Sequence, residues 1–279
     1  MTESRLIGPV RVVGAGLLGT SVGLGLRSRG LDVILADASP THVAIAVDLG
    51  AGRPAGPDDA PQLVVVAVPP DVTATVVANE LGAFPDAIVT DVASVKAPIV
   101  AAAVAAGLAD RFAGAHPLAG THGTGFDHAS PDRLRGCVVY VCATGSDRGE
   151  SAARGVSGFW QDTLGASAVR IDADAHDRQL AWTSHLPQAV ASALAHALAD
   201  RGLGALSFGS GGLDTTRLAA SSPELWTDIF LQNAAPVAEA LDAAQADAGR
   251  LAALIRTGDR TALRAYLDAA ATFRRGLDR

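Results

Sequence analysis

The segment FAGAHPLAGTHGTGFDH carries three histidines at six-residue spacing, His116, His122 and His128. Imidazole can bind a metal ion or exchange a proton near neutral pH, so metal coordination and general base catalysis are both open to this segment. A metal site would also need a carboxylate, which Asp127 or Asp132 could supply. The segment lacks helical HExxH spacing, however, and a glycine-rich loop does not preorganise metal ligands. We therefore expect no metal site here.

A second stretch with chemical potential is VRVVGAGLLGTS, in which Gly14, Gly16 and Gly19 have G-x-G-x-x-G spacing. The motif follows a predicted strand and opens a predicted helix, and Asp37 ends the next strand roughly 20 residues further on. Gly14 permits the tight turn, Gly16 lets a pyrophosphate approach the backbone, and Gly19 lets the helix pack on the sheet. This context predicts a dinucleotide-binding site.

Asp37 bears on which dinucleotide binds. Its carboxylate would accept hydrogen bonds from the adenosine ribose hydroxyls, and its charge would repel the extra phosphate of NADP. No arginine follows it in ADASPT. We expect NAD as cofactor, with NADP as the alternative. Further cofactor-binding residues are expected in the glycine loop and in AVPP, which ends a later strand: Leu17, Leu18, Val68 and Pro69.

The elements that must position these residues alternate along the first part of the chain. Strands are predicted at VRVV, LDVILAD, PQLVVVAV, DAIVTDV, CVVYVCA and SAVRID, with helices between most of them. Continuous apolar strands separated by helices indicate a parallel sheet covered on both faces. We predict an α/β fold with a Rossmann-type dinucleotide-binding domain at residues 1–171.

From about residue 172 the strand signals stop and an Ala- and Leu-rich helical pattern begins. Pro187 should break the first long helix, and Asp259 should cap a later one. Apolar positions such as Val237, Leu241 and Ile255 could be buried within the chain or against a second copy. We predict an all-helical substrate-binding and dimerisation domain at residues 172–279, and a homodimer.

Composition narrows the partners and the compartment. The 279 residues carry a formal net charge of −7, which argues against a nucleic-acid or anionic-membrane surface and favours a small-molecule partner. No apolar run is long enough for a membrane helix, and the amino terminus lacks the features of a signal peptide. Cys137 and Cys142 are expected on opposite faces of one strand, where they cannot pair. We expect a cytoplasmic protein.

Four further motifs occur in order along the chain: DVASVK (91–96), GAHPLAGTHGTGF (114–126), SHLPQ (184–188) and GGLDTTRLAASSPELW (211–226). Together they resemble the prephenate and arogenate dehydrogenases, the tyrosine-biosynthesis members of the 6-phosphogluconate-dehydrogenase-like superfamily. The resemblance implies an oxidative decarboxylation. Hydride passes from the hydroxyl-bearing ring carbon to NAD or NADP, the ring carboxylate leaves as carbon dioxide, and the ring becomes aromatic.

The resemblance also implies residue roles. His116 matches the catalytic histidine of the G-x-H-P motif, and a neutral imidazole can take the hydroxyl proton. Ser94 matches the serine that hydrogen-bonds the same hydroxyl. His185 and Arg217 match substrate-binding positions, and a guanidinium suits a carboxylate. Three other residues complete the expected site: Thr121 on a loop beside the substrate, Asp214 one turn before Arg217, and the lysine of the S-V-K motif, Lys96, whose role is open.

His122 departs from the family pattern, in which an acidic residue often follows the loop threonine. A histidine there removes a negative charge, which should suit the keto-acid side chain of prephenate and disfavour the ammonium group of arogenate. The sequence therefore predicts a prephenate dehydrogenase that gives 4-hydroxyphenylpyruvate. Arogenate or dual-specificity dehydrogenase activity is one alternative, and a non-catalytic NAD-binding module is another.

Each proposed site residue also has a structural explanation. His116 precedes a proline and could simply end a strand, and Ser94 could be a helix N-cap. His185 could serve packing beside Pro187, and Arg217 could form a surface ion pair with Asp214.

Overall fold

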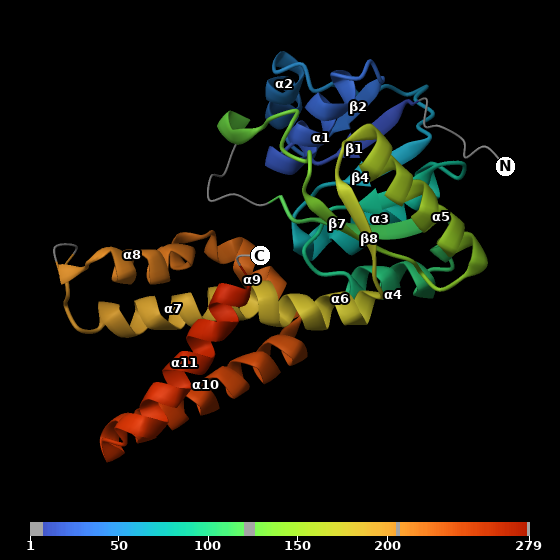
Figure 1. Ribbon diagram of the computed structural model, residues 1–279. Helices are drawn as coiled ribbons and strands as arrows, with labels where there is room; N and C mark the ends of the chain where they lie inside the picture. Colours follow the sequence, from blue (N-terminus) through green and yellow to red (C-terminus); the bar gives the residue numbers. More distant parts are fainter. Residues whose placement is uncertain (1–7, 120–125, 205–206, 278–279) are drawn as a thin grey trace. The chain divides into compact units, whose positions relative to one another are not determined.

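The computed structural model describes residues 8–119, 126–204 and 207–277. The chain divides into two compact units. The first consists of Met1–Leu180 and Ser221–Asn233, and the second of Ala181–Ala220 and Ala234–Arg279. The first unit contains the sheet (Figure 1) and extends beyond residue 171 to the end of helix α6.

The first unit is built on an eight-stranded sheet with the order β3-β2-β1-β4-β5-β6-β7-β8. Its strands are β1 (Val10–Val13), β2 (Val33–Ala36), β3 (Arg53–Pro54), β4 (Leu63–Val66), β5 (Ile88–Asp91), β6 (Phe112–Pro117), β7 (Val138–Cys142) and β8 (Ser167–Arg170). Neighbouring strands are parallel from β3 to β6 and again from β7 to β8, whereas β6 and β7 are antiparallel. The Rossmann-type fold is thus confirmed, with one antiparallel step that the sequence pattern did not predict.

Helices cover both faces of this sheet (Figure 1). They are α1 (Leu17–Arg27), α2 (Pro40–Asp48), α3 (Pro70–Ala83), α4 (Ala97–Ala105) and α5 (Asp147–Gly158). The first unit also contains α6 (Ala173–Leu180), which packs on α4, and α9 (Pro223–Gln232), which packs on α3. Short helical turns add Ala109–Arg111, Phe126–His128 and Phe159–Thr163. Successive residues of β4 enter two different hydrophobic clusters, since Val65 belongs to one and Val64 and Val66 to the other. Burial on both faces explains why the parallel strands are almost continuously apolar.

Two strands were not predicted from the sequence. Strand β3 has only two residues and lies at the edge of the sheet. Strand β6, FAGAHP, is buried along its whole length but consists mainly of small residues, so it lacks the β-branched signal of its neighbours. The missed strand matters because it carries His116.

The second unit is helical. It contains α7 (Leu186–Ala199), α8 (Ser210–Thr216), α10 (Ala234–Thr257) and α11 (Arg260–Gly276), with short turns at Ala181–His185 and Arg217–Ala220. Pro187 stands in the first turn of α7, and the residues just before it form a π-helical turn, so regular α-helical geometry is interrupted there as expected, while the helical run continues from Ala173 to Ala199. Asp259 caps α11 by accepting from the Ala262 N–H at 3.0 Å, also as expected.

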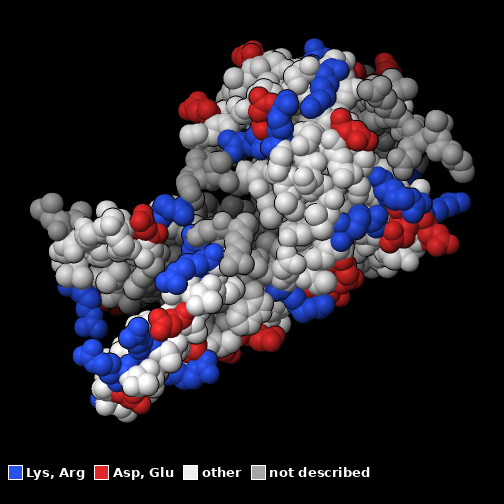
Figure 2. Space-filling view, viewed as in Figure 1, with Lys and Arg blue, Asp and Glu red and all other residues white. Residues whose placement is uncertain are grey.

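Charged side chains of both signs are interspersed on the face drawn in Figure 2. In the first unit Arg53 pairs with Asp32 at 3.0 Å and with Asp59 at 2.7 Å, and this guanidinium lowers the pKa of Asp59. In the second unit Arg264 lies 3.6 Å from Asp268 on α11. Among the described residues, no helix combines the length and the apolar character needed to cross a membrane.

Candidate active site

The carboxyl ends of four parallel strands bring several predicted site residues to one edge of the sheet. Because β1, β4, β5 and β6 run in the same direction, the segments that follow them leave the sheet at the same edge. These segments are the glycine loop after β1, Val68–Pro69 after β4 and Ser94 after β5, and His116 lies near the end of β6. The strand order reverses beside β1, between β2 and β4, where sheets of this kind bind dinucleotides.

The glycine loop has the geometry of a phosphate-binding turn. Gly14 has φ +99°, and a Cβ there would lie 2.3 Å from the carbonyl oxygen of Ala67. A Cβ on Gly19 would lie 1.8 Å from the carbonyl oxygen of Gly14, so only glycine lets α1 approach the turn. Gly16 precedes α1, which Leu17 and Leu18 begin, and a Cβ there would meet no atom within 4 Å. The backbone at the amino end of α1 is therefore open to an anionic ligand.

Asp37 follows β2 beside this loop. Its Oδ2 accepts from the Ala15 N–H at 2.7 Å, and its Oδ1 accepts from the Ser39 N–H at 2.8 Å. His42 Nδ1 lies 3.5 Å from Asp37 Oδ1. Each carboxylate oxygen can accept more than one hydrogen bond, so Asp37 can order the turn and still bind ribose hydroxyls.

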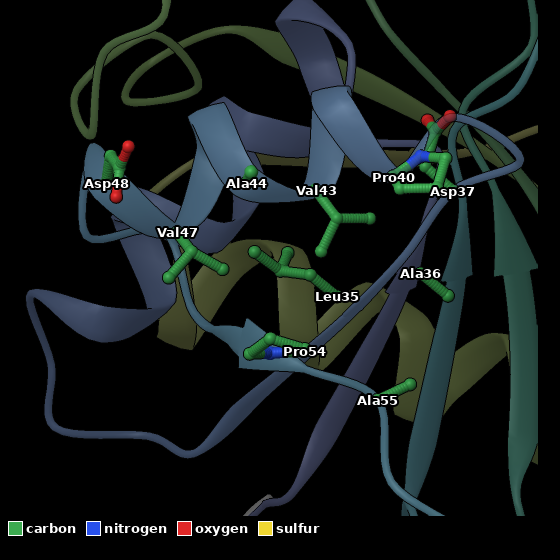
Figure 3. Close-up of a pocket in the computed structure, with 10 residues that line it drawn as sticks. All are labelled: Leu35, Ala36, Asp37, Pro40, Val43, Ala44, Val47, Asp48, Pro54 and Ala55. Atoms are coloured by element: carbon green, nitrogen blue, oxygen red, sulfur yellow. The ribbon is translucent and has the colours of Figure 1, made fainter.

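A hollow of about 600 Å³ lies next to Asp37, between α2 and strands β2 and β3 (Figure 3). Figure 3 shows Val43 and Val47 of α2 facing Leu35 and Pro54 across it, with Asp37 toward one end. The walls are mainly apolar, so the hollow suits a flat or apolar group. Its carboxylates disfavour a phosphate group.

His116 is buried, with 8% of its surface exposed, and is hydrogen-bonded through its ring. Its Nδ1 lies 2.9 Å from Nε2 of His176 on α6. The other ring nitrogen of His176, Nδ1, lies 2.7 Å from Oδ1 of Asp177. Tyr140, the cross-strand partner of His116 on β7, packs edge-on against the His176 ring at a centroid distance of 5.4 Å. Asp177, His176 and His116 therefore form a buried hydrogen-bonded network in the interior of the first unit.

Lys96 is the one lysine of the sequence. It follows β5, the strand on the other side of β6 from β7, and it stabilises β6 from that side. Its side chain is fully buried, and its Nζ pairs with Asp91 and donates to the carbonyl oxygen of Ala115 at 2.8 Å. Asp91 Oδ1 accepts from the Ala115 N–H at 3.2 Å. The residue before His116 is thus held through both of its peptide groups, which gives Lys96 a structural role that the sequence left open.

Ser94 lies in the bend between β5 and α4 and is half-buried. The N-cap residue of α4 is Lys96, and no side-chain cap bond is present there. The N-cap explanation for Ser94 is therefore wrong. Its place at the carboxyl edge of the sheet is consistent with a substrate contact, which stays a prediction.

The other predicted substrate residues belong to the second unit or lie outside the described residues. His185 ends the π-helical turn before α7 and is 1% exposed. Asp214 lies on α8, and Arg217 follows it at the start of the next turn; both are exposed. Thr121 and His122 lie outside the described residues. The roles of these five residues stay predictions.

The two cysteines and His128 are also among the described residues. Both cysteines are free thiols. Cys142 is buried opposite Gly114, and burial raises its pKa to about 12, so it stays protonated. The described residues contain no group of three or more potential metal ligands. His128 is exposed on a short turn, whereas His116 is inside the sheet.

Sequence reasoning missed His176 and Asp177. The buried residues of α6 are Ala173, His176, Asp177 and Leu180, which follow the i, i+3, i+4, i+7 spacing of a helix face that packs on a core. Two polar residues at core positions of such a face are the mark of a buried hydrogen-bonded network, because buried polar groups need partners. That signal was present in DAHDRQL.

Comparison with known proteins agrees with this geometry. Residues 22–169 match the family model described as the nucleotide-binding domain of prephenate dehydrogenase, and residues 172–269 match the one described as its dimerization domain. The chain belongs to the prephenate dehydrogenase family. The resemblance seen in the four sequence motifs is thereby confirmed.

Individual relatives cover most of the chain. The probable prephenate dehydrogenase NovF of Streptomyces niveus is 35% identical over 88% of this chain and 67% of its own length. The crystal structure of prephenate dehydrogenase from A. aeolicus, in complex with hydroxyphenyl propionate and NAD+, matches with a TM-score of 0.89 and 27% identity. It covers 99% of this chain and 100% of that one. The Synechocystis arogenate dehydrogenase matches with a TM-score of 0.80 and 26% identity, over 96% and 99% of the two chains.

Proposed function

We propose that this chain catalyses the NAD-dependent oxidative decarboxylation of prephenate to 4-hydroxyphenylpyruvate in tyrosine biosynthesis. The observation that carries the proposal is the position of His116 in a chain of this family. The histidine lies on β6, at the sheet edge that also carries the glycine loop, and its ring is held by a hydrogen bond to His176. An imidazole that a hydrogen bond keeps in one orientation, at the sheet edge where the nucleotide is expected to bind, suits proton abstraction coupled to hydride transfer.

The cofactor residues fit NAD. The open backbone at Gly16 and the amino end of α1 would hold the pyrophosphate, with Gly14, Gly19, Leu17 and Leu18 shaping the loop. Asp37 would accept from the ribose hydroxyls, and Val68 and Pro69 would line the crevice. When bound, NAD accepts the hydride. The negative charge of Asp37 favours NAD over NADP.

Each proposed substrate residue has a role of its own. His116 accepts the proton of the ring hydroxyl as the hydride leaves, and Ser94 hydrogen-bonds the same hydroxyl. Arg217 holds a substrate carboxylate, with Asp214 orienting the guanidinium. His185 and Thr121 are further substrate-binding residues. Loss of the ring carboxylate as carbon dioxide then completes the aromatic ring.

Prephenate is favoured over arogenate because His122 replaces an acidic residue in the loop. Arogenate dehydrogenase activity is the second candidate, since a structure named for that activity also matches the whole chain. The test is NADH or NADPH formation from prephenate and arogenate with each cofactor, in the presence and absence of a chelator. Turnover is expected with prephenate and NAD in both conditions. Turnover of neither acid would contradict the proposal and leave a non-catalytic nucleotide-binding module.

We also propose a homodimer formed through the helical region. The matched dimerization-domain description supports it, and so do large apolar side chains that the second unit exposes. On α10 these include Ile255 at 60% exposure, and on α11 Leu267 at 52% and Phe273 at 70%. Val237, by contrast, is buried within the chain. Light scattering should give twice the chain mass, and Phe273→Asp combined with Ile255→Asp should lower it; a monomer at micromolar concentration would contradict the dimer.

The proposed working compartment is the cytoplasm. Cys137, directly before β7, and Cys142, the last residue of β7, are both free thiols, which suits a reducing environment. Fractionation of cells that express the full-length protein, followed by immunodetection, would test this location.

A further inference from the structure

We propose that His176 and Asp177 are positioning residues that decide which ring nitrogen of His116 takes the substrate proton. The inference rests on the proposed function, in which His116 is the proton acceptor. Nothing in the four motifs that carry the family resemblance includes either residue. The argument comes from the hydrogen bonds of α6 and β6 in the first unit.

The hydrogen bonds define a direction. A carboxylate only accepts, so the 2.7 Å contact with Asp177 Oδ1 requires that His176 Nδ1 carry a proton. A neutral His176 then presents the lone pair of Nε2 to His116, 2.9 Å away. His116 Nδ1 must therefore donate, and the lone pair of neutral His116 lies on Nε2. The chain of side chains thus prepares one specific nitrogen as the base.

At the other end of this hydrogen-bonded network, backbone N–H groups hold Asp177 in place. Asp177 Oδ1 also accepts from the Lys96 N–H at 2.8 Å, and Oδ2 accepts from the Ala97 N–H at 2.8 Å, at the beginning of α4. Asn233 donates to the carbonyl oxygen of Asp177 at 2.8 Å. Every partner of the carboxylate is a donor, which fits its part as the acceptor that ends the chain.

This anchoring also joins the two supports of His116. Lys96 donates to Asp177 through its backbone N–H and to the Ala115 carbonyl through its side chain. The same residue therefore connects the carboxylate that orients His176 with the strand that carries His116. A shift of either support would move the imidazole relative to the sheet edge, where small displacements are costly for catalysis.

The arrangement matters most when the proton arrives. Protonation at Nε2 gives His116 a positive charge, and its Nδ1–H already points to a neutral His176 that is hydrogen-bonded to a carboxylate. The negative charge of Asp177 stabilises this cation through the intervening ring. Without the two residues, His116 could carry its proton on Nε2 and meet the substrate hydroxyl as a donor instead of an acceptor.

Asp177→Asn tests the negative charge at the end of this network. The amide oxygen can take the Oδ1 position and still accept from His176 and from the Lys96 N–H, so the variant removes the charge that stabilises protonated His116 and turns an NH2 group toward the Ala97 N–H. We expect kcat to fall about tenfold or more, with KM for prephenate and for NAD within about threefold of wild type. Asp172→Asn is the matched control, because this exposed carboxylate caps α6 through the Ala175 N–H at 2.9 Å, and only the backbone carbonyl of Asp172, which the substitution keeps, bonds His176. Equal kcat values in the two variants would overturn the proposal.

Substitutions at His176 separate positioning from packing. In His176→Gln the side-chain oxygen can accept from His116 and the amide nitrogen can donate to Asp177, whereas His176→Leu fills similar space with neither function. We expect His176→Gln to keep about tenfold more kcat than His176→Leu at similar melting temperatures. Equal losses in the two variants would show a packing role only and overturn the proposal.

A measurement on the wild-type protein tests the tautomer without relying on the folding of His176 or Asp177 variants. Nitrogen-15 NMR distinguishes the two neutral tautomers of histidine, and the signal that disappears in His116→Asn assigns His116. We expect a proton on Nδ1 of neutral His116, and a proton on Nε2 would overturn the inference. This readout does not depend on turnover, so the failure of the proposed function, namely no activity of the wild-type protein on either acid, remains a separate outcome.

Discussion

In the first unit His116, His176 and Asp177 are buried and joined by hydrogen bonds, whereas in the second unit Asp214 and Arg217 are exposed on and just after the short helix α8. A buried, hydrogen-bonded side chain is held in one geometry, and that suits a group that must exchange a proton along a defined line. An exposed arginine is a long side chain with a permanent charge, which suits capture of an anion. The difference predicts that substitutions at His116 and its buried partners mainly change kcat and that those at Arg217 mainly change KM.

The largest effect is expected at the buried end. His116→Asn keeps a polar side chain of similar size but removes the base, so kcat with prephenate should fall by about 100-fold or more. KM should change little, because the substrate carboxylates are bound elsewhere. Steady-state kinetics check both values. An unchanged kcat would remove His116 from the reaction.

At the exposed end, Arg217→Ala should raise KM for prephenate by about 10- to 100-fold, since a hydrogen bond to a charged group contributes about 1.5–3 kcal/mol. The decrease in kcat should be the smaller effect. Arg217→Lys is the control that keeps the charge but loses the two-pronged geometry, and it should give an intermediate KM. A normal KM for Arg217→Ala would place the residue outside the pocket.

The glycine loop sharpens the comparison within the first unit, because two of its glycines differ in their surroundings. Gly19→Ala brings a Cβ to within 1.8 Å of a backbone oxygen, so the melting temperature should fall by several degrees, at about 2–4 °C for each kcal/mol in a domain of this size. Gly16→Ala meets no atom within 4 Å and should leave the melting temperature unchanged. It should nevertheless raise the Kd for NAD about tenfold, because loss of one charge-assisted hydrogen bond costs about 1.5 kcal/mol. Calorimetry would measure both, and unchanged NAD affinity in Gly16→Ala would contradict the loop assignment.

The smallest effect is expected at Asp37, which is partly exposed. In Asp37→Asn the amide oxygen can still accept from one of the two backbone N–H groups, those of Ala15 and Ser39, that the carboxylate binds. Asp37→Asn removes the charge that repels the phosphate of NADP. The ratio of kcat/KM with NAD to that with NADP should fall by about tenfold or less. The same assay with His42→Ala is the control, since this neighbouring residue lies 3.5 Å from Asp37 but is not an expected ribose ligand. An identical ratio in wild type and Asp37→Asn would contradict the proposed cofactor contact.

Local patterns were sufficient for the fold class, the glycine loop and the family. Strands with apolar residues on both faces, glycines at defined spacing and a proline inside a helical pattern act through their own backbone conformation, so they are readable within a few residues. The Pro187 break and the Asp259 cap were predicted for this reason. Strand β6 was missed because its small residues are buried by neighbours that are distant in sequence.

The sequence alone determined that His116 precedes a proline within a motif typical of prephenate dehydrogenases, and that the whole chain resembles this family. Only the tertiary structure decided what surrounds this imidazole. His176 is 60 residues away in sequence, and Asp177 meets backbone groups of α4 that are 81 and 80 residues away. Hydrogen bonds over such separations exist only after β6, α4 and α6 have packed together. The tautomer proposed for His116 is therefore a consequence of the folded core and not of its own motif.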